Sequence, residues 1–149
     1  MSAPIDPDAP GAAGPASRRA LAAVALGGTM GTLSRYGVSR AIPTAPGSIP
    51  WSIFGVNVLG SLALGFVLQL ILERWPTDEF IRPFVAVGFI GSFTTFSTVM
   101  VDTDLLVRDG HSGIAAVYVA LSVVAGLVAA FAGIASARRL APRHPSSSW

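Results

Sequence analysis

Cysteine is absent from this chain of 149 residues. Disulfide bonds, thiolate metal sites and cysteine nucleophiles are therefore excluded, while the redox compartment is left open. Lysine is also missing, so that all ten basic residues are arginine, and charged residues make up only 12% of the chain. Hydrophobic residues make up 52%. Because so few charges cannot cover a water-exposed globular surface, the composition predicts an integral membrane protein.

The few charged and titratable residues exclude two further classes of protein. The net charge is +2, and no basic cluster is dense enough to indicate a nucleic-acid partner. His111 and His144 have no companion ligands beside them in the sequence. We therefore expect neither a zinc site nor an enzyme.

Four apolar stretches run along the chain, over residues 20–42, 51–72, 84–107 and 114–137. Each is close to the roughly 20 residues that a helix needs to cross about 30 Å of hydrocarbon. We therefore expect an all-α integral membrane protein, with residues 18–140 forming four transmembrane helices in the lipid bilayer. Residues 1–17 and 141–149 are rich in Pro, Ala and Ser, and we expect two tails there, the first of them disordered.

Arginines flank the apolar stretches unevenly. Arg18 and Arg19 imitate a twin-arginine export signal, but no suitable cleavage site follows and three more apolar stretches do, so flanking charges are the simpler interpretation. With four spans, both tails lie on one side of the membrane, and that side has seven arginines while the other has two. Because arginines are enriched on the cytoplasmic side, we expect a protein of the cell membrane with both termini in the cytoplasm. The seven are Arg18, Arg19, Arg74, Arg82, Arg138, Arg139 and Arg143, and the two are Arg40 and Arg108.

The third apolar stretch contains a run of glycines and hydroxyl side chains, Gly-Phe-Ile-Gly-Ser-Phe-Thr-Thr-Phe-Ser-Thr-Val, at residues 88–99. Such residues are tolerated at mid-membrane where a helix faces protein, water or an ion. We expect a helix that is broken there. The break would offer main-chain carbonyl oxygens to a hard monovalent cation, or amide and hydroxyl donors to an anion. A helix kinked only for packing is the alternative.

The other three stretches each contain polar side chains. Arg35 should face protein or water, either as an arginine that extends to the interface or as a fixed charge at the mouth of an anion path. Asn57 requires partners, which an interhelical hydrogen bond or a passing anion would supply. Tyr118 and Ser122 are four residues apart and so share a helix face, although such a pair would ordinarily be packing residues.

Three segments are informative together: Gly-Thr-Met-Gly-Thr-Leu-Ser-Arg-Tyr at 28–36, Val-Asn-Val-Leu-Gly-Ser at 56–61 and the third-stretch motif at 88–98, which is the specific one. Together they resemble the Fluc/CrcB family of fluoride channels. The resemblance covers residues 20–137. It implies a dimer of four-helix subunits inserted in opposite orientations, with two narrow fluoride paths and a structural sodium ion (Na+) at the subunit interface.

The resemblance also assigns roles to individual residues of this chain. Main-chain carbonyls in the broken helix would hold the sodium ion, Arg35 matches an arginine of the first span that faces the vestibule, and the remaining residues would line the fluoride pathway. The sodium ligands are Gly91 and Thr94, and the pathway residues are Asn57, Phe96, Ser97, Thr98, Tyr118 and Ser122.

Fluoride chemistry agrees with such a set of residues. Fluoride is small and strongly hydrated, so a selective path must replace water with hydroxyl and amide donors in a tight constriction. A phenylalanine ring edge adds a weakly positive surface. Passive conduction is enough for protection, because fluoride that enters the cell from an acidic medium as neutral HF dissociates inside and leaves as the anion down its gradient. The first two stretches have no glutamate or lysine in their interior, which argues against a proton-coupled exporter.

Two positions depart from the family pattern, and both weaken a pore. Val99 stands where a second phenylalanine is usual, and Gly126 stands where a further hydroxyl residue would be expected. Together with the arginine bias, they favour a heterodimer with an oppositely oriented paralogue. A homodimer with altered pore lining and a non-conducting structural subunit are the alternatives. Asp102 and Asp104 either mark the end of the third span or tune a vestibule.

Overall fold

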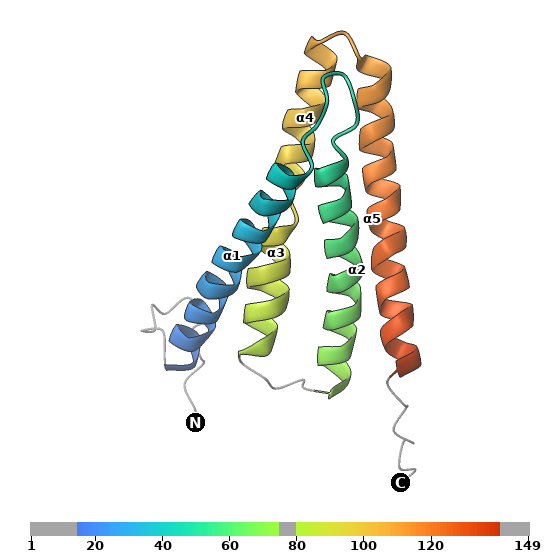
Figure 1. Cartoon of the computed structure of the whole chain (residues 1–149). Coiled ribbons are helices and arrows are strands. Elements are labelled where there is room, and N and C mark those ends of the chain that lie inside the picture. The colour runs from blue at the N-terminus through green and yellow to red at the C-terminus, as the bar shows by residue number, and fades with distance from the viewer. Residues whose placement is uncertain (1–14, 75–79, 141–149) are drawn as a thin grey trace, which may run out of the picture.

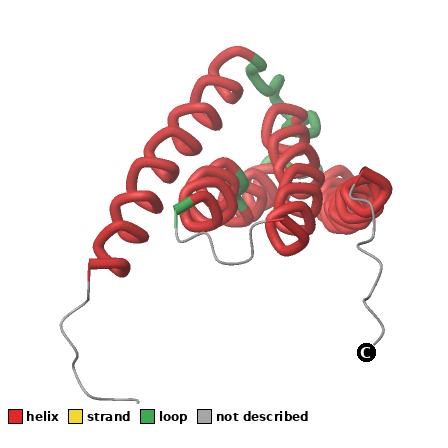
Figure 2. Tube along the Cα trace, turned by 90° about the horizontal axis from the view of Figure 1, so that it is seen from below, coloured by secondary structure: helices red, strands yellow, loops and turns green. Residues whose placement is uncertain are grey.

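The computed structural model describes residues 15–74 and 80–140, and within these ranges its regular structure is entirely helical (Figure 2). The helix α1 begins at Pro15, three residues before the expected boundary of the N-terminal tail, and residues 1–14 and 141–149 lie outside the described part. The elements are α1 (Pro15–Ala41), α2 (Trp51–Arg74), the π-helical segment η1 (Arg82–Ile90), α3 (Gly91–Phe93), α4 (Phe96–Arg108) and α5 (Ser112–Leu140).

Three segments of the described chain are long and apolar enough to cross a membrane. They are Trp51–Ile71, Arg82–Arg108 and Ser112–Leu140, and the second of them includes η1, α3 and α4. The helix α1 has 27 residues but does not belong to this set, because glycine, threonine, serine and Arg35 dilute its apolar residues. The three expected spans that correspond to these segments therefore occur as helices, and the first expected span is a helix of lower hydropathy.

The helices pack in two close pairs, α1 with η1 and α3, and α2 with α5 (Figure 1). Glycines make both pairs possible. A Cβ added at Gly27 would overlap the carbonyl oxygen of Phe84, and one added at Gly65 would overlap that of Ala130. Backbones that approach this closely gain dispersion contacts, which drive helix association in lipid.

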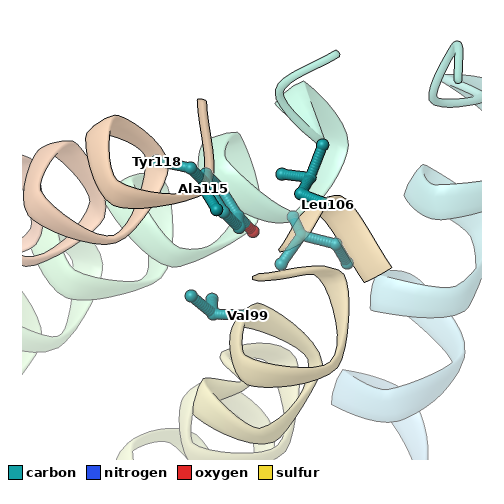
Figure 3. Packing of buried hydrophobic residues seen from close by; sticks show 5 residues of the cluster. Val99, Leu106, Ala115 and Tyr118 are labelled. Atoms are coloured by element: carbon teal, nitrogen blue, oxygen red, sulfur yellow. The ribbon is translucent and has the colours of Figure 1, made fainter. Parts of the chain in front are cut away.

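One end of the bundle is closed by a small apolar core between α4, α5 and the start of α2. Its buried side chains are Ile53, Val99, Leu106, Ala115 and Tyr118, and four of them are labelled in Figure 3. The loop between α1 and α2 reaches the turn that joins α4 to α5 (Figure 1). Gly47 has φ +69° there, and a Cβ at this position would lie 2.8 Å from the imidazole of His111. A side chain at position 47 would therefore collide with His111.

Candidate functional site

The third expected helix is broken between α3 and α4, as the run of glycine and hydroxyl residues predicts. Thr94 has φ −78° and ψ 156°, and Thr95 has φ −153° and ψ 120°, so both residues are extended while their neighbours are helical. Extended backbone inside a membrane segment leaves amide and carbonyl groups that other parts of the protein must satisfy.

Asn57 of α2 satisfies both main-chain groups of Thr95. Its Nδ2 donates to the carbonyl oxygen of Thr95 at 3.0 Å, and its Oδ1 accepts from the amide nitrogen of Thr95 at 2.8 Å. The carboxamide therefore pairs with the break as a neighbouring peptide group would. One hydrogen of Nδ2 is not used in this pairing, since a carboxamide has two N–H donors.

The side chain of Thr95 begins the next helix. Its Oγ1 accepts from the amide of Thr98 at 3.2 Å, which is the usual N-cap interaction. The same oxygen lies 3.0 Å from Oγ1 of Thr98 and 3.2 Å from Oγ of Ser97. The three hydroxyls form one small network at the N-terminus of α4.

These interactions release two particular carbonyl groups. In an uninterrupted α-helix the carbonyl of Gly91 would accept from the amide of Thr95, and the carbonyl of Thr94 would accept from the amide of Thr98. Both amides instead donate elsewhere, to Oδ1 of Asn57 and to Oγ1 of Thr95. The two residues that the family resemblance assigns to a sodium ion are therefore among the four, residues 91–94, whose carbonyls lose their helical donors at the break.

Two further contacts stabilise the end of α3. Nε of Arg35 donates to the carbonyl of Ser92 at 3.2 Å, and the half-buried arginine thus lies against the break. Oγ1 of Thr94 donates to the carbonyl of Ile90 at 3.1 Å. Arg35 faces protein, as its charge requires, and it contacts the third segment directly.

A groove of about 480 Å³ runs beside the break, between α2, α4 and α5. Of the predicted residues, Asn57, Gly91, Thr94, Phe96 and Ser122 line it, and the side chain of Phe96 is 68% exposed. The lining residues are all uncharged. The other lining residues are Ser61, Thr95, Val99, Val119, Val123, Gly126, Leu127 and Ala130.

The other predicted pathway residues lie outside this groove. Tyr118 is fully buried in the core beside Val99 and Leu106 (Figure 3). Ser97 and Thr98 belong to the hydroxyl network around Thr95.

The two aspartates of α4 have different surroundings. Asp102 is half-buried beside Tyr118, with one carboxylate oxygen shielded from solvent. Asp104 is exposed and forms an ion pair of 2.8 Å with Arg108 one helical turn away. Asp104 therefore belongs to the helix surface.

Two features of the site escape the sequence-based interpretation. The first is the pairing of Asn57 with the main chain of Thr95, for which the only signal is an amide side chain in one apolar stretch and a hydroxyl run in another. The second is Ser61, which lines the groove one helical turn after Asn57. Its spacing of four residues was the available signal, because positions i and i+4 share a helix face.

Within the described residues, an uncharged polar groove beside a break in a membrane segment has the construction of an ion pathway. The sequence profile of the family described as "CrcB-like protein, Camphor Resistance (CrcB)" matches residues 22–134. This chain belongs to that family, and it is a multi-pass membrane protein without enzymatic activity.

Several named relatives support the assignment. A protein called fluoride-specific ion channel FluC 3, from Streptomyces avermitilis, is 50% identical over 131 residues, which cover 83% of this chain and 64% of that longer relative. FluC 2 of Nocardia farcinica is 41% identical over 87% of this chain and 93% of its own length. FluC 1 of Mycolicibacterium paratuberculosis is 40% identical over 85% and 96%. The chain thus spans less than two thirds of the first relative and nearly all of the other two.

Proposed function

We propose that this chain is a subunit of a fluoride-selective channel, through which cytoplasmic fluoride leaves the cell passively and fluoride toxicity is reduced. The names of its relatives give the ion. The observation that carries the proposal is the groove itself, where Asn57, Ser122 and Phe96 converge beside the N-terminus of α4.

Each group in the groove suits a small anion. Asn57 retains one N–H donor, and Oγ of Ser122 is buried without a partner. The amides of the first turn of α4 carry the positive end of the helix dipole. The exposed ring of Phe96 presents a weakly positive edge. All residues that line the groove are uncharged, which suits passive conduction.

A sodium ion at the break is the second part of the proposal. Main-chain carbonyls are suitable ligands for a hard monovalent cation, and the carbonyls of Gly91 and Thr94 have lost their helical donors. Among the described residues no group of three histidine or acidic side chains lies together, and the proposed ligands are main-chain oxygens. When bound, the ion would neutralise the partial negative charge of these carbonyls.

The complete channel requires a second subunit. We propose a dimer of four-span subunits in opposite orientations, in the cell membrane, with both termini of this chain in the cytoplasm. The open side of the groove and the exposed ring of Phe96 would then meet the partner subunit. We favour a paralogue over a second copy of this chain as the partner, because Val99 and Gly126 lack pore groups that a partner would supply and the arginine bias fixes one orientation for this chain. Streptomyces avermitilis has at least two such relatives, FluC 2 and FluC 3, so paralogues coexist in one cell there.

Fluoride efflux from liposomes, followed with a fluoride electrode, tests this proposal. The purified chain is reconstituted alone and together with the second family member of its own cell. We expect efflux of fluoride but not of chloride, and only from the mixed assembly. Efflux from the chain alone would support the homodimer with altered lining. If Asn57→Ala and Phe96→Ala left the fluoride resistance of cells unchanged, the non-conducting structural subunit would be the correct function.

A further inference from the structure

We propose that the hydroxyl of Ser61 contacts fluoride in the groove, and that it replaces from α2 the hydroxyl that α5 lacks at Gly126. The inference rests on the proposed function. It adds a residue to the pathway. It also means that the missing hydroxyl at Gly126 does not interrupt the polar lining, although the sequence alone suggests that it does.

The two positions lie next to each other in the lining of the groove. A Cβ built on Gly126 would lie 3.5 Å from Oγ of Ser61, at ordinary contact distance. The Ser61 hydroxyl therefore lies next to the space that a side chain at position 126 would fill. Both residues line the groove.

The same arrangement places Ser61 in register with the other polar groups. Ser61 follows Asn57 by four residues on α2, and Gly126 follows Ser122 by four residues on α5. Since positions i and i+4 share a helix face, Asn57 and Ser61 form one polar row and Ser122 begins the facing row. An anion that passes Asn57 and Ser122 would meet Ser61 next.

The helix pair that carries both rows is closely packed. Added side-chain carbons at Gly65 and Gly133 would overlap the carbonyl oxygens of Ala130 and Leu62, respectively. The backbones of α2 and α5 are thus in direct contact one to two turns beyond Ser61 and Gly126. This contact fixes the distance between the two rows.

The hydroxyls of Ser61 and Ser122 differ from several other hydroxyls of the chain, including that of Thr94, which lines the groove but donates to the carbonyl of Ile90. Thr29, Ser34 and Ser136 donate to the carbonyl four residues earlier in their own helices. Ser122 makes no such bond, and its Oγ is buried without a partner. Within the described part of the chain, Ser61 likewise has no hydrogen bond through its hydroxyl. Two unengaged hydroxyls in one groove are available to a ligand.

Four variants test the inference in the fluoride efflux assay: Ser61→Ala, Gly126→Ser, the double variant S61A/G126S, and Ser136→Ala as a control. Ser136 is an exposed serine of α5 that bonds to its own helix, outside the groove. Each variant is reconstituted in the assembly in which the wild-type chain conducts. The melting temperature of each variant in detergent is measured alongside, to separate loss of function from loss of fold.

We expect Ser61→Ala to slow efflux by about tenfold, because a hydrogen bond to a charged group is among the stronger ones. The double variant should recover most of the wild-type rate, since its hydroxyl enters the same space from α5. Ser136→Ala should match the wild type. Wild-type efflux from Ser61→Ala, or a double variant as slow as the single one at an unchanged melting temperature, would overturn the inference and leave the channel assignment intact. Failure of the wild-type chain to conduct fluoride in any assembly would instead refute the proposed function and the inference with it.

Discussion

Asn57 and the backbone of Thr95 are joined by two hydrogen bonds, of 3.0 and 2.8 Å, one in each direction. The pair links α2 to the break in the third membrane segment. Since α2 is also packed against α5, the Asn57 side chain holds the break at a fixed distance from the two helices that line the groove.

Replacing Asn57 by alanine should destabilise the protein. It leaves the amide and the carbonyl of Thr95 without partners, and each unmet buried group costs about 1–3 kcal/mol. The melting temperature in detergent should fall clearly. Gln69→Ala is the matched control, because Gln69 is a carboxamide of the same helix that bonds only to Glu73 one turn away. Equal melting of the two variants would contradict the bridging role of Asn57.

Replacing Thr95 by valine should weaken sodium binding as well as the fold. The variant loses the N-cap oxygen, at a cost of about 1 kcal/mol, and it returns the amide of Thr98 to the carbonyl of Thr94. Thr95→Ser keeps the oxygen and should resemble the wild type. The measurement is the rise in melting temperature as Na+ replaces a large organic cation. A wild-type protein indifferent to Na+ would refute the proposed sodium site.

Adding a methyl group at Gly65 should disturb the α2–α5 pair, because a Cβ there overlaps the carbonyl oxygen of Ala130. Forced overpacking of this kind costs about 1–3 kcal/mol. Gly55→Ala is the control on the same helix, since a Cβ at Gly55 meets nothing within 4 Å. We expect a lower melting temperature for Gly65→Ala and an unchanged or higher one for Gly55→Ala. The reverse order would show that the two helices are not in backbone contact.

Replacing Arg35 by lysine should not preserve its function. Lysine keeps the positive charge but has no Nε to donate to the carbonyl of Ser92, so the end of α3 loses a partner. We expect Arg35→Lys and Arg35→Gln to melt at similarly reduced temperatures, while Arg40→Gln, an exposed arginine near the end of the same helix, melts as the wild type does. A lysine variant as stable as the wild type would mean that Arg35 acts through its charge alone.

The sequence predicts the helical elements well and the contacts between them poorly. Apolar length places α2, the third segment and α5 within three residues of their observed ends, because hydropathy is a local property. The break at Thr94 and Thr95 is also local, since clustered hydroxyls and glycines weaken a helix.

The contacts of the site depend on which helix faces which, and a single sequence does not encode that directly. Asn57 is predicted as a group in need of partners, but its partner is a main-chain group 38 residues away. Ser61 is not predicted, because only the packing of α2 against α5 places its hydroxyl beside Gly126 in the groove. Tyr118 has the spacing of a pathway residue, yet its ring lies in the apolar core, where helix rotation places it.

The order of the residues around the break has a consequence for biosynthesis. Arg35 and Asn57, which contact Ser92 and Thr95, both precede the third segment in the chain. A ribosome therefore delivers α1 and α2 to the membrane before the segment Arg82–Arg108 emerges. That segment is apolar and long enough to enter as a single span, and its interrupted backbone finds its donors and acceptors already in place. Moving either partner behind the third segment by circular permutation would oblige the nascent chain to hold unmatched peptide groups in lipid.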